Sequence, residues 1–443
     1  MNNLFITKIY KKFCNFLLGS ILFLYPFGIY GIRPLDIFNL NQNSYFISFC
    51  HIFLIVFVIL GFVRLKKKNI YLILLAEIFI FLPVFTSGND YLIKDLIHYD
   101  YFGSINSLFY LSLLFIFGVI IFDQIRYDHF LYFLKIILLA ILISSIFHIL
   151  QFMTFVIFKY KLYALFCDQI SLICGDSYLR ASKYNYMGEL MRSSGFVGAT
   201  NRSVSYLIPG LFLALLFFNK SNNRIFIYIY LIISLAVLST LSRLSIFLLL
   251  FNLFVFGFFF FKSKNYINIL KNINFNSIKF TLIFFGVLIL FVPGIFHDKF
   301  NLLEQRNFGD YTRVFQNLIL AFSVSFQNFG LGVGYHIIDD YLFFHTDVEL
   351  WGSHSNMVQL IGGLGIFFTV VVFYFLFNNF KKINLNKITI LALALIVFSF
   401  FIIGLMKTYF LNIYGIFFLS ILLKLCSKNN TTIKNNIKNY SSN

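Results

Sequence analysis

Long apolar segments alternate with short polar connections over most of the chain. Twelve of these segments are close to the roughly 20 residues that a helix needs to cross a bilayer, although a few are shorter. The pattern predicts an all-α polytopic membrane protein, a single bundle over residues 1–443 with about 12 transmembrane helices. The predicted spans are 14–32, 44–63, 69–88, 104–122, 129–158, 204–219, 225–239, 243–261, 278–294, 355–377, 389–406 and 409–423.

Two connections are much longer than the rest, and both are predicted on the outer side of the membrane. They cover residues 159–203 and 295–354. Function is often concentrated in long loops carried by a rigid scaffold, so we expect the chemistry of this protein there. The polar, low-complexity segment 426–443 is predicted to be a disordered cytoplasmic tail.

Composition supports the membrane prediction and changes how the charge is interpreted. Hydrophobic residues make up 60% of the 443 residues and charged residues 12%, where soluble domains have roughly a quarter. The net charge of +18 could suggest nucleic acid. With the N-terminus inside, however, the inner segments hold 21 Lys and Arg against two acids, and the outer segments hold 13 against 14. This bias follows the positive-inside rule, so we expect cytoplasmic termini, contact with membrane lipid and no nucleic-acid partner.

The cysteines and glycines give less specific signals. Cys167 and Cys174 lie close together in the first long loop, where a disulfide and two unpaired thiols are equally compatible with the sequence. Gly330–Gly334 reads GLGVG but follows no predicted strand, so we reject a dinucleotide site and expect a turn against the membrane. No cluster of residues has the spacing of a metal site, so no metal is predicted.

Two arginines near the predicted outer surface are candidate anion-binding residues. Arg192 is followed by small residues at the end of the first long loop, and Arg243 opens a span after almost no loop. Guanidinium binds phosphate in a bidentate manner, and an arginine buried without a partner is costly. Simple anchoring to lipid headgroups is the commoner role for Arg192 and is equally compatible with Arg243.

A histidine closes the second long loop. His354 lies in Gly352-Ser353-His354-Ser355-Asn356, at the start of the tenth predicted span. A histidine at a helix start is usually an interfacial or capping residue. One that titrates near neutrality can also orient or deprotonate a hydroxyl group.

These three sites, taken in order, resemble the O-antigen polymerase and O-antigen ligase superfamily. The shared features are Arg-Ser-x-Gly after a long outer loop, Ser-Arg opening a later span, and a second long loop that ends in His-Ser. After His354-Ser355, nine residues precede Gly365, as in the ligase pattern, but Phe368 departs from its last position. The Arg-x10-Gly element of some polymerases is absent at Arg192, Arg306 and Arg313.

The resemblance implies a GT-C-like fold in the bacterial inner membrane and a glycosyltransferase without a cofactor. The implied donor is an undecaprenyl-diphosphate-linked oligosaccharide, and the family allows a chain-length regulator as a further partner. By resemblance, Arg192 and Arg243 would neutralise the diphosphate, and His354 would act on the acceptor hydroxyl or steady the diphosphate. The remaining candidate substrate-binding residues are Arg180, Asp310, Arg313 and Ser355.

The sequence is compatible with three functions. A polymerase of lipid-linked repeat units is favoured, because the excess of Phe, Ile, Asn and Lys is typical of AT-rich polysaccharide gene clusters. A ligase that transfers the glycan to lipid A core shares the mechanism and differs in its acceptor. A flippase or transporter without catalysis predicts charged residues along the spans, where only Glu77 and Lys135 lie well inside, and this favours the enzyme.

Overall fold

The computed structural model is a bundle of helices with two very short strand pairs. It describes residues 2–28, 30–32, 47–86, 101–125, 127–160, 162, 186–187, 190–197, 200–221, 223–262, 309–334, 338, 355–380, 388–406 and 411–427. The elements are α1 (Asn2–Leu24), η1 (Tyr25–Phe27), β1 (Gly31–Ile32), β2 (Ile47–Ser48), α3 (Phe49–Phe62), α4 (Lys67–Thr86), α6 (Tyr101–Gln124), α7 (Tyr127–Phe158), β3 (Tyr186–Met187), β4 (Leu190–Met191), η2 (Gly195–Val197), α9 (Thr200–Ser221), α10 (Ile225–Ser239), α11 (Arg243–Lys262), α14 (Gly309–Gln327), α16 (Asn356–Val358), η3 (Gln359–Gly363), α17 (Ile366–Phe380), α18 (Ile388–Met406) and α19 (Ile413–Ser427).

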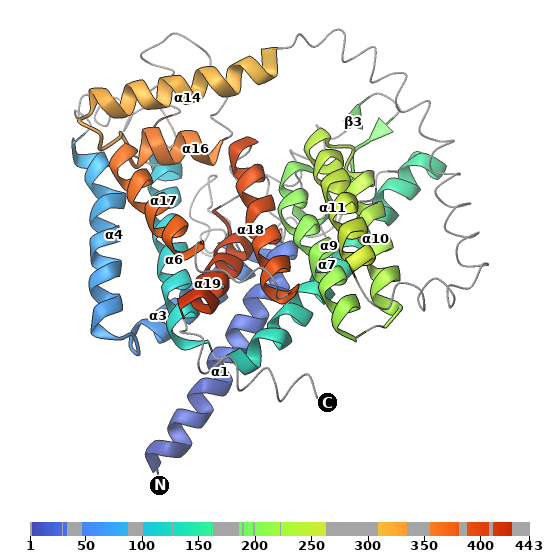
Figure 1. The fold of residues 1–443 in the computed structure, drawn as a ribbon, viewed down its shortest axis with the longest axis horizontal. Coiled ribbons are helices and arrows are strands. Elements are labelled where there is room, and N and C mark those ends of the chain that lie inside the picture. The colour runs from blue at the N-terminus through green and yellow to red at the C-terminus, as the bar shows by residue number, and fades with distance from the viewer. Residues whose placement is uncertain are drawn as a thin grey trace.

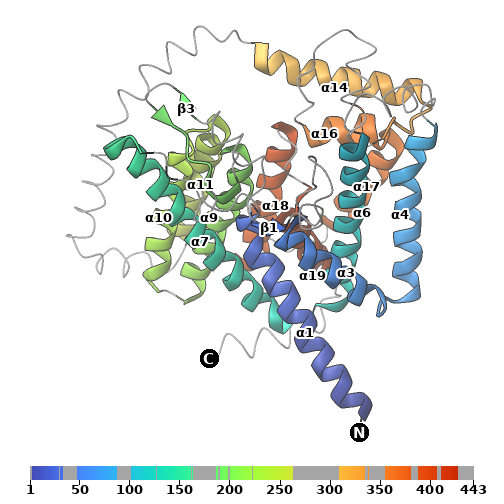
Figure 2. The ribbon, with the colours of Figure 1, turned by 180° about the vertical axis from the view of Figure 1, so that it is seen from behind.

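The helices form two groups with α18 and α19 between them. One group contains α4, α6 and α17, and the other contains α7, α9, α10 and α11 (Figures 1 and 2). The amphipathic helix α14 lies across the end of the first group, and α16 and β3 lie at this same end. The start of α1 lies at the opposite end. We call these two ends the far end and the N-terminal end.

Helix α9 is the central element of the second group. It packs against α7, α10, α11 and α18, and every residue from Ser203 to Phe218 is buried. Its side chains are apolar around most of its circumference, as expected of a helix that is surrounded by others. Tyr206 is among the largest side chains that are fully buried. Helix α9 begins at the far end, where it directly follows the end of the first long loop.

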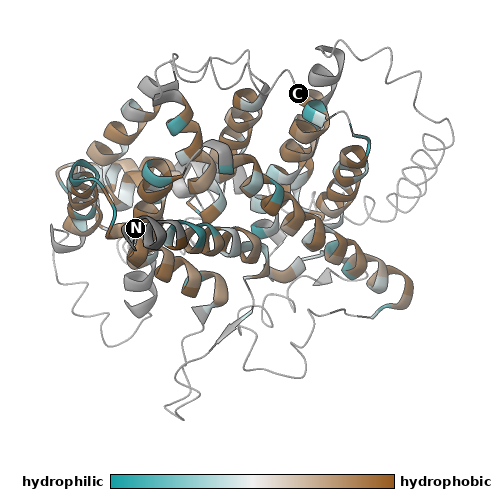
Figure 3. Cartoon of the chain, turned by 90° about the horizontal axis from the view of Figure 1, so that it is seen from below, coloured by the Kyte–Doolittle hydropathy of each residue, from teal (hydrophilic) through white to brown (hydrophobic). Residues whose placement is uncertain are grey.

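The outer surface of the bundle is apolar in a way that suits lipid. In Figure 3 most helical residues are coloured hydrophobic. Helix α7 exposes a stripe of large apolar side chains spaced three or four residues apart: Leu139, Ile143, Ile146, Leu150, Met153 and Ile157. At 1.5 Å per residue this stripe is about 27 Å long, close to the thickness of a bilayer's hydrocarbon core. Two described helices, His129–Phe158 and Arg202–Ser221, are long and apolar enough to cross a membrane, and several shorter apolar helices accompany them.

The helices agree closely with most of the predicted spans, but the first and tenth spans differ. Helix α1 covers Asn2–Leu24 where 14–32 was predicted, and the last two residues of that predicted span form β1. Instead of one helix over 355–377, a short α16 continues into a π-helical turn, η3, and α17 starts afresh at Ile366. The break coincides with Gly365, whose φ is +91°, a conformation that side chains disfavour. The predicted span 278–294 lies outside the described residues.

Glycines make this break possible through close backbone contact. Val333 N and Gly334 N donate to the carbonyls of Gly362 and Gly363, at 2.9 and 2.8 Å. A Cβ atom at Gly332 or Gly365 would overlap the opposing backbone. The GLGVG segment therefore forms a turn, as predicted, but it packs against the π-helical turn and attaches α14 to the tenth span. The second long loop is accordingly not all loop, because α14 lies within it.

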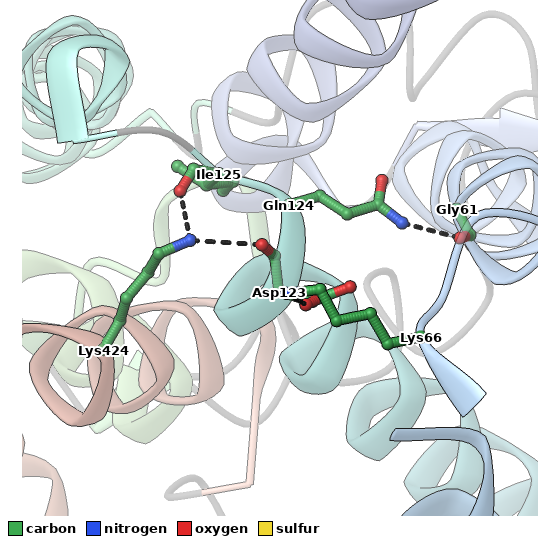
Figure 4. Close-up of polar contacts among 6 residues, drawn as sticks. All are labelled: Gly61, Lys66, Asp123, Gln124, Ile125 and Lys424. Atoms are coloured by element: carbon green, nitrogen blue, oxygen red, sulfur yellow. Dashed lines mark hydrogen bonds and ion pairs between the residues drawn. The ribbon is translucent and has the colours of Figure 1, made fainter. Parts of the chain in front are cut away.

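Segments that the sequence places on the inner side meet at the N-terminal end of the bundle. Lys66 Nζ lies 3.4 Å from Asp123 Oδ1, and Gln124 Nε2 donates to Gly61 O at 2.7 Å. Lys424 Nζ donates to the carbonyls of Ile125 and Asp123 (Figure 4). The last carbonyls of a helix have no partner within it, so Lys424 of α19 caps the end of α6.

We expect these two lysines to contribute unequally to stability. Lys424→Met removes a half-buried ammonium from two carbonyls and should lower the free energy of unfolding by about 1–2 kcal/mol. Lys66→Met should lower it by less, about 0.5–1 kcal/mol, because the Lys66 side chain is 77% exposed and solvent screens its ion pair, although the Asp123 side chain is only 9% exposed. Thermal unfolding in detergent measures both, and an equal effect of the two variants would contradict the capping role.

Candidate functional site

The end of the first long loop is bound directly to the turn that precedes Arg243. Ser193, next to Arg192, donates its backbone N–H to Ser239 O at 3.1 Å, and the two Oγ atoms lie 2.7 Å apart. Both side chains are buried, and 46 residues separate them in the chain. The hydrogen bonds therefore bring the segment that carries Arg192 to the last turn of α10. The Arg192 side chain is half-buried.

Side-chain hydrogen bonds of Thr240 hold the short turn between α10 and α11. Thr240 Oγ1 lies 2.7 Å from Val237 O and 2.9 Å from Ser245 Oγ, which joins the two helices across the turn. Leu241 adopts a φ of +47°, which is uncommon for a residue with a side chain. Arg243 is the first residue of α11. The backbone of Arg243 thus lies four residues beyond the contact with Ser193, while its side chain lies outside the described part of the chain.

A buried histidine is hydrogen-bonded to Ser193, on the side away from Ser239 in the network. His148, on α7, has no exposed surface; its Nδ1 lies 2.9 Å from Ser193 Oγ and its Nε2 2.9 Å from Tyr206 OH on α9. Ser144 Oγ donates to the same Tyr206 hydroxyl at 3.2 Å. Side chains from α7, α9, α10 and the end of the first long loop thus form one continuous hydrogen-bonded network inside the bundle.

The hydrogen-bond donors in this network can be assigned by starting from Ser239. Ser239 Oγ donates its one proton to Ala236 O at 2.8 Å, so Ser193 Oγ must be the donor to Ser239. Ser193 then accepts from His148 Nδ1–H, and His148 Nε2 accepts from Tyr206. His148 thus uses both ring nitrogens within the protein. It serves the structure of the site and does not act on a substrate in this arrangement.

Gln151, one turn further along α7, holds the loop at both of its ends. Its Oε1 accepts from Ser194 N at 3.2 Å and from Gly195 N at 3.0 Å. Its Nε2 donates to Leu162 O at 3.0 Å, at the beginning of the same loop. Gln151 is 1% exposed, so these bonds form away from solvent.

Gly195 is required by its position in η2. Its φ is +59°, and a Cβ atom there would overlap the His148 ring. The next residue, Phe196, stacks on Phe147 with ring centroids 4.1 Å apart and contacts Phe27 at 4.9 Å. Through these ring contacts the end of the loop packs against α7 and η1.

The second half of the predicted site is described only in part. Ser355 is buried; its Oγ donates to Gly404 O at 3.3 Å and accepts from Met357 N at 3.2 Å. It therefore caps the start of α16 and joins it to the end of α18. Both α18 and α10 pack on α9, so this junction and the Ser193 contact involve two helices that share α9 as a neighbour. His354 itself lies outside the described residues.

The other predicted residues are only partly covered. Asp310 and Arg313 lie in the first turns of α14, and their side chains are outside the described part. Arg180, Cys167 and Cys174 lie outside it as well. Among the side chains that are described, no group of three His, Cys, Asp or Glu could hold a metal ion.

His148 and Gln151 were missed by the sequence predictions, although a signal was present. Ser144, His148 and Gln151 follow one another at intervals of four and three residues inside an apolar span, so they share one helix face. Polar residues within membrane helices usually face the bundle interior.

Comparison of the chain with protein-family models, with curated proteins and with solved structures found no match in any of the three.

Proposed function

We propose that this protein is a membrane glycosyltransferase that polymerises lipid-linked O-antigen or capsular repeat units. Its donor would be a glycan on undecaprenyl diphosphate, and its acceptor a sugar hydroxyl at the periplasmic face. The observation that carries the proposal is the Ser193–Ser239 contact, which joins the Arg192 segment to the turn before Arg243.

The chemistry requires positive charge more than strong acid catalysis. The acceptor oxygen forms a bond to the anomeric carbon, the bond from that carbon to the diphosphate oxygen breaks, and the polyprenyl diphosphate departs. Two fixed guanidinium groups would stabilise the charge that develops on the leaving diphosphate in a water-poor site. Arg192 and Arg243 would supply them, and His354 would accept the proton of the acceptor hydroxyl.

The architecture suits a substrate that is anchored in lipid. The apolar stripe on α7 matches a bilayer core, and the lysine-rich segments meet at the end opposite the candidate site. We therefore place the N-terminal end in the cytoplasm and the far end at the outer face of a bacterial inner membrane. The arrangement of about 12 spans and the GT-C-like fold belong to the same proposal.

The test is deletion of the gene in its native host, followed by gel electrophoresis of the surface glycan. Loss of a polymerase leaves lipid A core capped by single repeat units, and reintroduction of the intact chain restores the ladder. A ligase would instead leave long chains on the lipid carrier, and a flippase would leave repeat units facing the cytoplasm. Either of these results, or an unchanged ladder, would overturn the proposed polymerase.

A further inference from the structure

We propose that Gln151 is a positioning residue that sets where Arg192 meets the lipid-linked diphosphate. The inference rests on the proposed function and adds to it a residue that makes no contact with substrate. Gln151 would act by clamping both ends of the first long loop to α7, at Leu162 and at Ser194–Gly195.

The clamp is specific because one amide satisfies three backbone groups. Its oxygen accepts two adjacent N–H groups, and its nitrogen donates to a carbonyl more than 30 residues earlier in the chain. Backbone groups buried without partners are unfavourable, so the loop ends are best satisfied when they lie against Gln151. An apolar side chain of the same length fills the space but satisfies none of the three groups.

The clamp is connected to Arg192 through two consecutive residues, Ser194 and Ser193. Ser194, which donates to Gln151, follows Ser193, which is bound to Ser239. If the clamp is lost, Ser193 can leave the α10–α11 turn, and the distance between the two arginine backbones is no longer fixed. His148 supports the same segment through Ser193 but has no contact with the start of the loop among the bonds described here.

Disulfide crosslinking measures this positioning without reference to activity. The Oγ atoms of Ser193 and Ser239 are 2.7 Å apart, so cysteines at these positions are within disulfide reach. We expect the Ser193→Cys/Ser239→Cys chain to crosslink on mild oxidation in membranes, detected by mass spectrometry of the joined peptides. Adding Gln151→Met should lower the yield at least about 5-fold, because the loop end is released.

The control comes from the same helix. Within the described part of the chain, Thr154 Oγ1 bonds only to carbonyls of α7 itself, at 2.8 and 3.1 Å, so Thr154→Val should leave the crosslink unchanged. In the chain that keeps both serines, Gln151→Met should lower glycan transfer at least about 10-fold at normal membrane levels, as misplacement of a charged group does. Gln151→Glu retains acceptors for Ser194 and Gly195 but, when ionised, has no donor for Leu162 O, so it should recover only part of the transfer lost in Gln151→Met.

The outcomes separate the clamp from the proposed function. If the crosslink depends on Gln151 but the unaltered chain makes no polymer, the clamp stands and the polymerase assignment fails. If polymer is made and Gln151→Met leaves crosslinking and transfer unchanged, the positioning role is wrong. It is also wrong if Gln151→Met fails to accumulate in the membrane while Thr154→Val does, because Gln151 would then serve folding.

Discussion

Replacing Arg192 or Arg243 with alanine is expected to lower glycan transfer at least about 100-fold, the usual effect of removing a preorganised group that stabilises transition-state charge. Lysine at either position should recover only part of the activity, because an ammonium group cannot bind a phosphate in a bidentate manner. The amount of polymer made by membranes of each variant, normalised to the amount of protein, measures the effect. His354→Ala is expected to abolish transfer as well, through loss of the proton acceptor.

The matched control is Arg224, at the other end of α10. It is exposed, lies at the N-terminal end of the bundle and makes no side-chain cap to its helix. Arg224→Ala should leave transfer within about 2-fold of the unaltered chain, as expected for a surface substitution. Normal transfer by the Arg192→Ala, Arg243→Ala and His354→Ala variants would discard the proposed site.

Gly195→Ala is expected to lower the stability of the protein strongly. A residue with a Cβ atom is strained at the φ of +59°, and the methyl group would overlap the ring of His148. The two effects together should lower the free energy of unfolding by about 2–4 kcal/mol. Relief of the overlap requires His148 or the loop to move, so transfer should fall as well. Thermal unfolding in detergent and transfer by membranes measure the two effects.

Gly28 provides the control for this substitution. It lies just after η1, its φ is −63°, and an added Cβ atom would meet no heavy atom closer than Tyr25 O at 3.5 Å. Gly28→Ala should therefore change the free energy of unfolding by less than about 1 kcal/mol. If the Gly195 and Gly28 variants behaved alike, the packing of η2 against His148 would be wrong.

The sequence predicted the helical segments well because their signal is local. A run of apolar residues can be recognised without knowledge of its neighbours, and α7, α10, α11 and α18 begin and end within about three residues of the predicted limits. The tenth span was predicted as one helix because hydropathy does not register a π-helical turn. Its break depends on the distant glycines at 330–334, which pack against it only in the folded chain.

The candidate site divides in the same way. The chemical character of Arg192 and Arg243 could be recognised in the sequence, since a guanidinium group beside small residues at a predicted outer surface suits a phosphate. The contact of Ser193 with Ser239, and the roles of His148 and Gln151 behind it, came only from the tertiary structure. Hydropathy and motif spacing report on residues that are close along the chain, whereas hydrogen bonds between helices depend on which faces meet after packing. The sequence by itself thus determined the segments and the candidate charges, and the packing of α7, α9 and α10 decided that Ser193 and Ser239 meet with His148 and Gln151 beside them.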